Sequence, residues 1–248
     1  MSQTIEGAAL HDTNELGQPV GFAVPGWQPP ALPPRETMEG RHCRLEPLSN
    51  AHGAQLYAAN ALDRDGGMWT YMSHGPFETV ESYLAWVDDV STKADPLFFA
   101  IVERKSGKPL GVASYMRIDR HAGSIEVGSI AYSPLLKRSP AATEAMYLMM
   151  RNAFQLGYRR YEWKCNAHNA PSRAAAQRLG FSYEGIFRQH MVVKGRNRDT
   201  AWYAAIDSEW PALKAAFERW LAPENFDASG RQKSRLSELT APVLKARG

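Results

Sequence analysis

A strand, a basic turn and a long helix follow one another directly between Ser124 and Phe154. Side chains of residues 124–132 alternate between two faces of a predicted strand, which places Glu126 and Tyr132 on the same face. The helix is expected to begin at Ser139-Pro140, because Ser is a favourable N-cap and Pro fits the first helical position. One stripe of this helix is apolar, with side chains recurring every three or four residues at Ala142, Ala145, Met146, Met149 and Ala153.

Two cations, Lys137 and Arg138, lie just before this predicted helix. The free N–H groups and the dipole of a helix N-terminus already favour anions. The strand, the turn and the helix together therefore indicate a phosphate site. The alternative is a plain connection, since most strand-to-helix junctions bind nothing.

Shorter elements surround this unit. Strands are predicted near residues 41–46, 96–102, 109–116 and 161–166, with two more on either side of 194–198. Helices are predicted near residues 50–60, 79–93, 169–179 and 208–220, and Gly180 is placed to end the third of them in a left-handed conformation. This order predicts an α/β or α+β domain, in which helices flank a mixed, mostly antiparallel and strongly bent sheet.

The chain divides into three parts. Its 248 residues suffice for one well-filled domain, predicted at residues 40–221. Residues 222–248 read as a tail with a short amphipathic helix at about 232–239. Residues 1–39 are rich in proline and predict an extended arm; the alternative is a disordered leader. Part of the arm is expected to pack on the domain through its apolar residues Val20, Phe22, Val24 and Trp27.

Composition excludes several classes of protein. The net charge of +3 is too small to argue for a nucleic-acid binder, and no apolar run approaches the roughly 18 residues that a membrane span needs. The N-terminus does not resemble a secretory signal. Cys43 and Cys165 lie far apart, which favours a reducing cytoplasm over a disulfide scaffold. The histidines show no metal-ligand spacing, so no metal is expected.

Several short motifs occur in an order and spacing that resemble the GNAT superfamily of acyl-CoA-dependent N-acetyltransferases, most closely its RimJ/RimL-like branch. They are AlaThrGluAla at 142–145, GlyTyrArgArg at 157–160, Asn169 with Ser172, LeuGlyPhe at 179–181, GluGly at 184–185, and Asp199. The resemblance covers about residues 40–220. It implies acetyl-CoA as co-substrate and a primary amine as acceptor, either a protein N-terminus or a small molecule.

The resemblance also implies a cofactor site built from the strand end, the basic turn and the helix start. Its residues would be Ile130, Ala131, Tyr132, Lys137, Arg138, Ser139, Ala141, Ala142, Thr143 and, on the pantetheine arm, Asn169. One position departs from the family pattern, because Pro140 stands where a glycine usually supplies an N–H group. Either Lys137 and Arg138 compensate, or cofactor affinity is reduced.

Glu126 is the candidate general base, acting through a water. Ile125 and Val127 point to the other face of the strand, so burial alone need not raise the pKa of Glu126. The alternative is an idle ion pair with an arginine. Glu144 and His168 are two other candidates for the base.

Ser172 is the candidate acid that protonates the departing thiolate, by the same resemblance. It lies with Asn169 on either side of Pro171, at a predicted helix start. The alternative for both residues is simple helix capping.

Two other functions remain open at this point. The Pro140 departure favours a GNAT-like module that binds acyl-CoA without catalysis. The basic cluster at residues 194–198 allows an RNA-binding accessory protein, although a solvated hairpin turn is the preferred interpretation. The loop at residues 63–77 resembles the variable loop that lines the acceptor pocket in the family, and packing of its aromatics into the core is equally open. A homodimer is possible.

Overall fold

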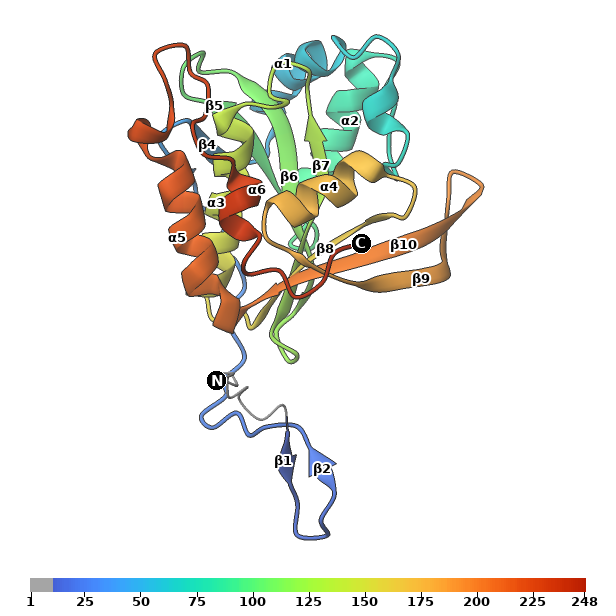
Figure 1. Cartoon of the computed structure of the whole chain (residues 1–248). Coiled ribbons are helices and arrows are strands. Elements are labelled where there is room, and N and C mark those ends of the chain that lie inside the picture. The colour runs from blue at the N-terminus through green and yellow to red at the C-terminus, as the bar shows by residue number, and fades with distance from the viewer. Residues whose placement is uncertain (1–10) are drawn as a thin grey trace.

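The computed structural model describes residues 11–248, and its centre is an eight-stranded sheet (Figure 1). The strands lie in the order β3-β4-β5-β6-β7-β8-β10-β9, and every neighbouring pair is antiparallel except β7 and β8. This confirms the predicted mixed, mostly antiparallel sheet. The bounds are β3 Met38–Glu39, β4 Cys43–Pro47, β5 Leu97–Glu103, β6 Pro109–Asp119, β7 Ser124–Tyr132, β8 Arg160–Asn166, β9 Ser182–Val193 and β10 Arg196–Ile206, with a separate hairpin of β1 Asp12–Thr13 and β2 Pro19–Val20.

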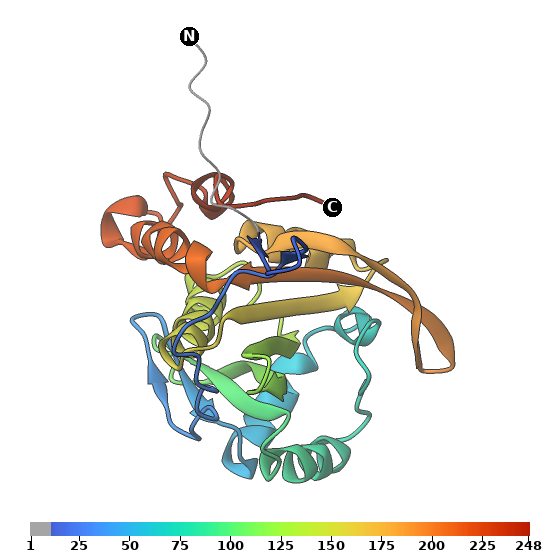
Figure 2. The ribbon, with the colours of Figure 1, turned by 90° about the horizontal axis from the view of Figure 1, so that it is seen from below.

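Helices cover both faces of the sheet (Figure 2). The first two helices pack beside β5 and β6, and the later ones pack on the opposite face. Helix α3 is the centre of the main core, because eleven of its sixteen residues are buried. The bounds are α1 Asn50–Asn60, α2 Val80–Ser91, α3 Pro140–Gln155, α4 Ala170–Arg178, α5 Trp210–Leu221 and α6 Leu236–Thr240, with short 3-10 turns η1 Gly67–Trp69, η2 Asp207–Glu209 and η3 Pro223–Asn225.

Local signals at α3 and α4 act as predicted. The Ser139 hydroxyl accepts a hydrogen bond from the Ala142 N–H at 3.1 Å, and Pro140 occupies the first turn. Gly180 follows α4 with φ of +89°, the left-handed conformation that ends a helix. Side-chain capping and glycine geometry are local, which is why the sequence located these boundaries.

A β-bulge in β7 corrects one prediction about side-chain direction. Between two of its pairs with β6, β7 has one extra residue, and Ser129 there adopts a φ of +48°. Beyond a bulge the alternation of faces is reversed. Glu126 therefore shares a face with Ala131, and Tyr132 lies on the other face, contrary to the expectation that Glu126 and Tyr132 lie together.

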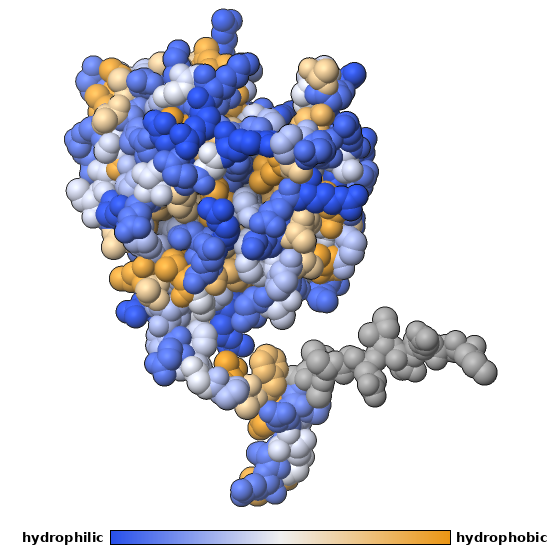
Figure 3. Space-filling model, turned by 90° about the vertical axis from the view of Figure 1, so that its left-hand side faces the viewer, coloured by the Kyte–Doolittle hydropathy of each residue, from blue (hydrophilic) through white to orange (hydrophobic). Residues whose placement is uncertain are grey.

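The N-terminal arm contacts the domain over a shorter stretch than the sequence predicts. The hairpin of β1 and β2 projects from the body (Figures 1 and 3). Val20, Phe22 and Val24 are 39%, 57% and 40% exposed, so their expected packing against the domain was wrong. Trp27 is half-buried, and the guanidinium of Arg159 lies 5.4 Å from its ring centre. The first ten residues of the predicted arm lie outside the described residues.

The C-terminal tail, residues 222–248, is attached to the domain. Its helix α6 begins four residues later than the sequence suggested and packs against α4 and α5. Leu236 and Thr240 are buried there, and the Thr240 hydroxyl donates to the carbonyl of Arg178 at 3.0 Å. Further on, the Lys245 N–H donates to the Ser182 hydroxyl at 2.9 Å. These contacts hold the tail along α4 and the start of β9.

Candidate active site

The parallel strands β7 and β8 stop pairing halfway along their length. They are paired from Ser124 with Arg160 to Val127 with Trp163, and no further pair between them is present in the described chain. Beyond that point β8 continues to pair with β10 on its other side. The centre of the sheet is therefore open between the second halves of β7 and β8.

A cavity of about 1310 Å³ adjoins this opening. Tyr132 at the end of β7 and Trp163 on β8 both line it, so it reaches the place where pairing stops. A second part of its wall is the turn and first residues of α3, from Lys137 to Thr143. The remaining wall comes from α4, the end of α5 and the tail.

The start of α3 offers donors for an anion. Arg138 has a φ of +61°, and neither its N–H nor that of Ala141 makes a hydrogen bond within residues 11–248. Lys137 lies 3.5 Å from the Asp63 carboxylate, a long and half-exposed ion pair that leaves the ammonium largely available. Pro140 has no N–H group, but it occupies the first helical position, where an N–H group would have no partner within the helix. Two cations, Lys137 and Arg138, therefore line the cavity at a helix N-terminus that has two free N–H groups, an arrangement suited to a pyrophosphate.

The residues predicted to bind the cofactor are only partly brought together. The cavity wall includes Tyr132, Lys137, Arg138, Ser139, Ala142 and Thr143. Four predicted residues do not line the cavity: Ile130, Ala131, Ala141 and Asn169. Ile130 and Ala131 precede Tyr132 at the end of β7, Ala141 lies at the start of α3, and Asn169 lies just before α4. The predicted phosphate site is thus a surface of this cavity, and the roles of individual residues remain predictions.

Glu126 is buried, with 2% of its surface exposed. Its Oε1 accepts a hydrogen bond from Arg117 at 2.8 Å, and the Lys164 ammonium lies 3.1 Å from Oε2 without hydrogen-bond alignment. Burial raises the pKa of Glu126, and the two cations oppose that shift only in part. The sequence suggested that burial need not raise this pKa, but it does, because the side chain is enclosed between the neighbouring strands β6 and β8. The alternative named an ion pair with an arginine, and Arg117 does form an ion pair with Glu126.

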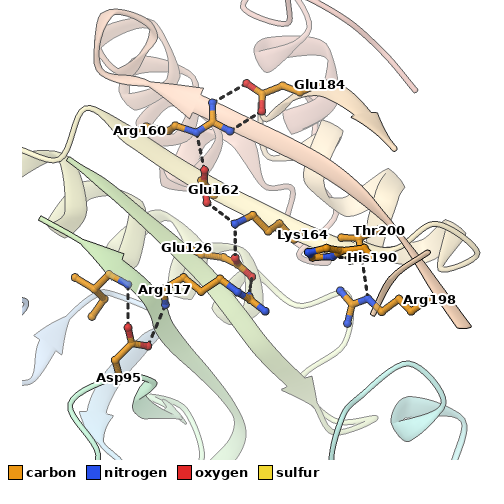
Figure 4. A network of polar contacts seen from close by, with 11 residues as sticks. Asp95, Arg117, Glu126, Arg160, Glu162, Lys164, Glu184, His190, Arg198 and Thr200 are labelled. Atoms are coloured by element: carbon orange, nitrogen blue, oxygen red, sulfur yellow. Dashed lines mark hydrogen bonds and ion pairs between the residues drawn. The ribbon is translucent and has the colours of Figure 1, made fainter. Parts of the chain in front are cut away.

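A ladder of alternating charges extends from Glu126 across β8 to β9 (Figure 4). Lys164 joins Glu126 to Glu162, at 2.7 Å from the latter, and its ammonium lies 3.8 Å from the centre of the Trp202 ring. The ladder reads Arg117, Glu126, Lys164, Glu162, Arg160 and Glu184. Each carboxylate therefore has cations beside it, which fixes Glu126 in one position. Sequence reasoning missed Arg117 and Lys164, and alternation along their strands was the only available signal.

Two side chains of the basic cluster at residues 194–198 make contacts within the protein. The Lys194 ammonium donates to the Trp69 carbonyl at 2.9 Å, which ties the β9–β10 hairpin to η1. Arg198 is half-buried, and its guanidinium donates to the Thr200 hydroxyl at 3.2 Å. Partial burial, and then the cations nearby, lower the pKa of His190 beside Thr200. Lys194 and Arg198, two of the cations that an RNA-binding surface would need, thus form hydrogen bonds within the protein.

Asn169 and Ser172 make capping contacts at the start of α4. The Asn169 side chain accepts a hydrogen bond from the Ser172 N–H at 3.2 Å, which is the capping role left open above. The Ser172 hydroxyl accepts from the indole N–H of Trp163 at 3.0 Å, and Trp163 lines the cavity. That bond uses only an acceptor lone pair of the Ser172 hydroxyl, and the Cys165 thiol lies within hydrogen-bonding reach of the same hydroxyl.

The two other candidates for a base are placed elsewhere. Glu144 is buried in α3, where its carboxylate accepts backbone N–H groups of Arg41 at 2.9 Å, His42 at 2.6 Å and Cys43 at 2.8 Å. It therefore anchors β4 to α3. His168 is exposed in the turn between β8 and α4.

The aromatic loop at residues 63–77 packs mainly inward. Trp69 is buried and its ring meets those of His74 and Phe77 at 5.9 and 5.4 Å between centres. His74 stacks on Trp86 of α2 at 4.8 Å, and burial lowers its pKa to about 4. Tyr71 reaches across to the His168 carbonyl at 3.2 Å. The loop thus bridges the α2 side of the sheet to the turn before α4.

Comparison with known proteins agrees with this geometry. The acetyltransferase (GNAT) domain family matches residues 42–182. The chain belongs to the GNAT acetyltransferase family. Its GNAT fold is similar to a crystal structure of a GCN5-related N-acetyltransferase from Brucella melitensis, at 52% identity and a TM-score of 0.86 over 88% of this chain and 100% of that one.

Two other GNAT structures are informative. A probable acetyltransferase from Chromobacterium violaceum is 38% identical, with a TM-score of 0.73 over 79% of this chain and 98% of that one. Mycobacterium smegmatis RimJ in complex with CoA-disulfide is 20% identical, with a TM-score of 0.62 over 71% of this chain and 88% of that one. This last likeness shows the shared fold, and the RimJ/RimL-like branch stays a prediction. This GNAT protein is an acyltransferase that uses acetyl-CoA.

Proposed function

We propose that this enzyme transfers the acetyl group of acetyl-CoA to a primary amine, with Glu126 as general base through a water and Ser172 as general acid. The observation that carries the proposal is the placement of a buried carboxylate of raised pKa beside the opening between β7 and β8. On the α3 side of that opening lies the cavity with its cations and free N–H groups. Donor and acceptor can therefore approach from opposite faces of the sheet and meet where pairing stops.

The acetyl donor fits the residues of the cavity. The Lys137 and Arg138 cations on the cavity wall, with the free N–H groups at the start of α3, would hold its pyrophosphate. Acetyl-CoA supplies a thioester carbonyl that an amine can attack. Trp163 and Tyr132 form the walls beside the opening through which that thioester would extend.

The base and the acid have separate tasks. The attacking amine forms the new C–N bond and must lose a proton, which Glu126 accepts by way of a water. The C–S bond breaks, and the departing thiolate takes the proton of the Ser172 hydroxyl as that hydroxyl regains a proton from water. Glu126 then releases its proton to solvent, which restores both groups. Burial raises the pKa of Glu126 toward physiological pH. A general base is more effective when its pKa is closer to the pH at which it works.

The acceptor is a protein N-terminal amine or a small-molecule amine. An α-amino group, with a pKa of about 7.7–8.0, is partly neutral at physiological pH, whereas an alkylamine at about 10.4 is almost wholly charged. A carboxylate base suffices for the first and less easily for the second. This favours an α-amine, in agreement with the RimJ/RimL-like resemblance.

The test is a screen that measures free thiol released from acetyl-CoA. The panel contains short peptides with free N-termini, matched N-formyl peptides, amino acids and polyamines. We expect amine-dependent thiol release that is absent with the formylated peptides. Tight binding of acetyl-CoA in calorimetry with no thiol release for any amine would instead support the non-catalytic acyl-CoA module.

A further inference from the structure

We propose that the C-terminal tail recognises the 3′-phosphate of CoA, so that the enzyme discriminates acetyl-CoA from its 3′-dephospho analogue. This inference rests on the proposed function, because it takes the cavity at α3 as the acetyl-CoA site. It adds a binding role for residues outside the matched GNAT domain, which ends at residue 182.

The tail supplies a large part of the cavity wall. Its lining residues are Phe226, Gly230, Arg231, Gln232, Lys233, Arg235 and Glu238. Three of these are cations and one is an acid, so this wall is positively charged. It is separate along the chain from the cations Lys137 and Arg138 at the start of α3.

The tail cations are free to meet a ligand. The Arg231 side chain is 83% exposed, and its polar contacts within residues 11–248 are to the Asp227 carboxylate and the Ser229 hydroxyl of its own loop. Arg235 is 73% exposed and lies 4.0 Å from Glu238, at the limit of an ion pair. Lys233 has no ion pair within the part of the chain that the structure describes. Exposed pairs of this kind are weak and are readily exchanged for a phosphate.

The loop that carries these cations has a defined shape. The side chain of buried Asn225 donates to the Trp220 carbonyl at 2.9 Å and accepts the Ser234 N–H at 2.8 Å. The Lys233 N–H donates to the Asn225 carbonyl at 2.6 Å. The Trp220 indole donates to Gln232 at 2.7 Å. The backbone on either side of Lys233 is therefore fixed against the end of α5, and only the cationic side chains need to adjust.

CoA carries two anionic centres that match two basic walls. Its pyrophosphate lies in the middle of the molecule, and its 3′-phosphate lies on the ribose beside the adenine. Because the start of α3 and the tail line the same cavity, a CoA whose pyrophosphate lies at α3 would have its ribose phosphate near the wall made by the tail. Half-buried Phe226, packed edge-on against Trp220 at 5.3 Å between ring centres, gives this wall apolar surface for a purine.

The experiment compares the binding of CoA and 3′-dephospho-CoA to the full chain by calorimetry. We expect the wild-type protein to bind CoA at least about tenfold more tightly, as the loss of charge-assisted contacts to one phosphate implies. The triple variant Arg231→Ala, Lys233→Ala, Arg235→Ala should bind CoA about tenfold more weakly and 3′-dephospho-CoA as the wild type does. Thermal melting confirms that the variant is folded.

A matched control removes the same charge elsewhere. Lys105→Ala, Lys108→Ala, Lys214→Ala changes three exposed cations that do not line the cavity and should retain the wild-type preference. Equal binding of both ligands by the wild type overturns the tail proposal, as does equal weakening of both ligands in the tail variant. If acetyl transfer occurs without any such preference, only the tail proposal fails. If neither ligand binds, the cofactor assignment fails with it.

Discussion

Replacement of Glu144 separates a structural carboxylate from a catalytic one. Glu144 accepts three backbone N–H groups, from Arg41, His42 and Cys43, in a buried setting. A hydrogen bond to a charged group contributes about 1.5–3 kcal/mol, and contributions from one carboxylate do not add fully. Glu144→Gln keeps one carbonyl acceptor but turns its NH₂ group toward a backbone donor. We therefore expect a loss of about 3 kcal/mol in the free energy of unfolding.

The assay for this prediction is urea unfolding together with turnover per folded molecule. A loss of this size lowers the melting temperature by about 6–12 °C in a domain of this length. Turnover should stay within about twofold of the wild type below the melting range. The exposed Glu36→Gln variant is the control and should change neither quantity. A large fall in turnover without a fall in stability would refute the assignment and return Glu144 to the list of candidate bases.

Three further predictions concern the cavity and the proton path. Lys137→Ala with Arg138→Ala should weaken acetyl-CoA binding about tenfold or more in calorimetry and leave the melting temperature nearly unchanged; unchanged affinity contradicts the pyrophosphate site. Ser172→Ala should lower turnover at least about tenfold and also reduce stability, because Trp163 loses its acceptor; a stability loss alone would indicate a purely structural hydroxyl. Arg117→Gln removes a cation that lowers the pKa of the neighbouring carboxylate, so the acidic limb of the pH–rate profile should move to higher pH; a limb that moves to lower pH contradicts this electrostatic reasoning.

Features set by neighbouring residues in the chain could be predicted from sequence. Ser139 and Pro140 identified the start of α3, and Gly180 identified the end of α4, because caps and left-handed turns depend on a few adjacent residues. The residue order also gave the sheet type and the family. The basic turn at Lys137 and Arg138, predicted as part of a phosphate site, lies on the wall of the cavity, and its binding role stays a prediction.

Features that depend on distant residues could not be predicted. The bulge at Ser129 follows Gly128, and an isolated glycine in a strand is compatible with a bulge without fixing one. The bulge moves Tyr132 to the opposite face from Glu126. The burial of Glu126 depends on Arg117 from one neighbouring strand and Lys164 from the other. The environment of this carboxylate is decided by strand pairing and not by the alternation within β7.

The tail shows the same limit for a whole segment. Its sequence suggested an appendage, whereas Leu236 and Thr240 are buried against α4 and α5. That packing brings the loop around Lys233 to the cavity. The packing partners lie more than fifty residues away for α4, so no local pattern indicated this role.

The most direct test of the account is the pH–rate profile of wild-type enzyme and of Glu126→Gln, with an acceptor identified by the thiol screen. A base must be deprotonated to act, so activity should fall as pH drops through the pKa of Glu126. Because burial raises that pKa, the acidic limb of the wild-type profile should lie above the usual carboxyl range. Glu126→Gln should lower turnover at least about a hundredfold, abolish this limb and leave acetyl-CoA affinity unchanged. A variant that keeps both the wild-type rate and the acidic limb would show that Glu126 is not the base.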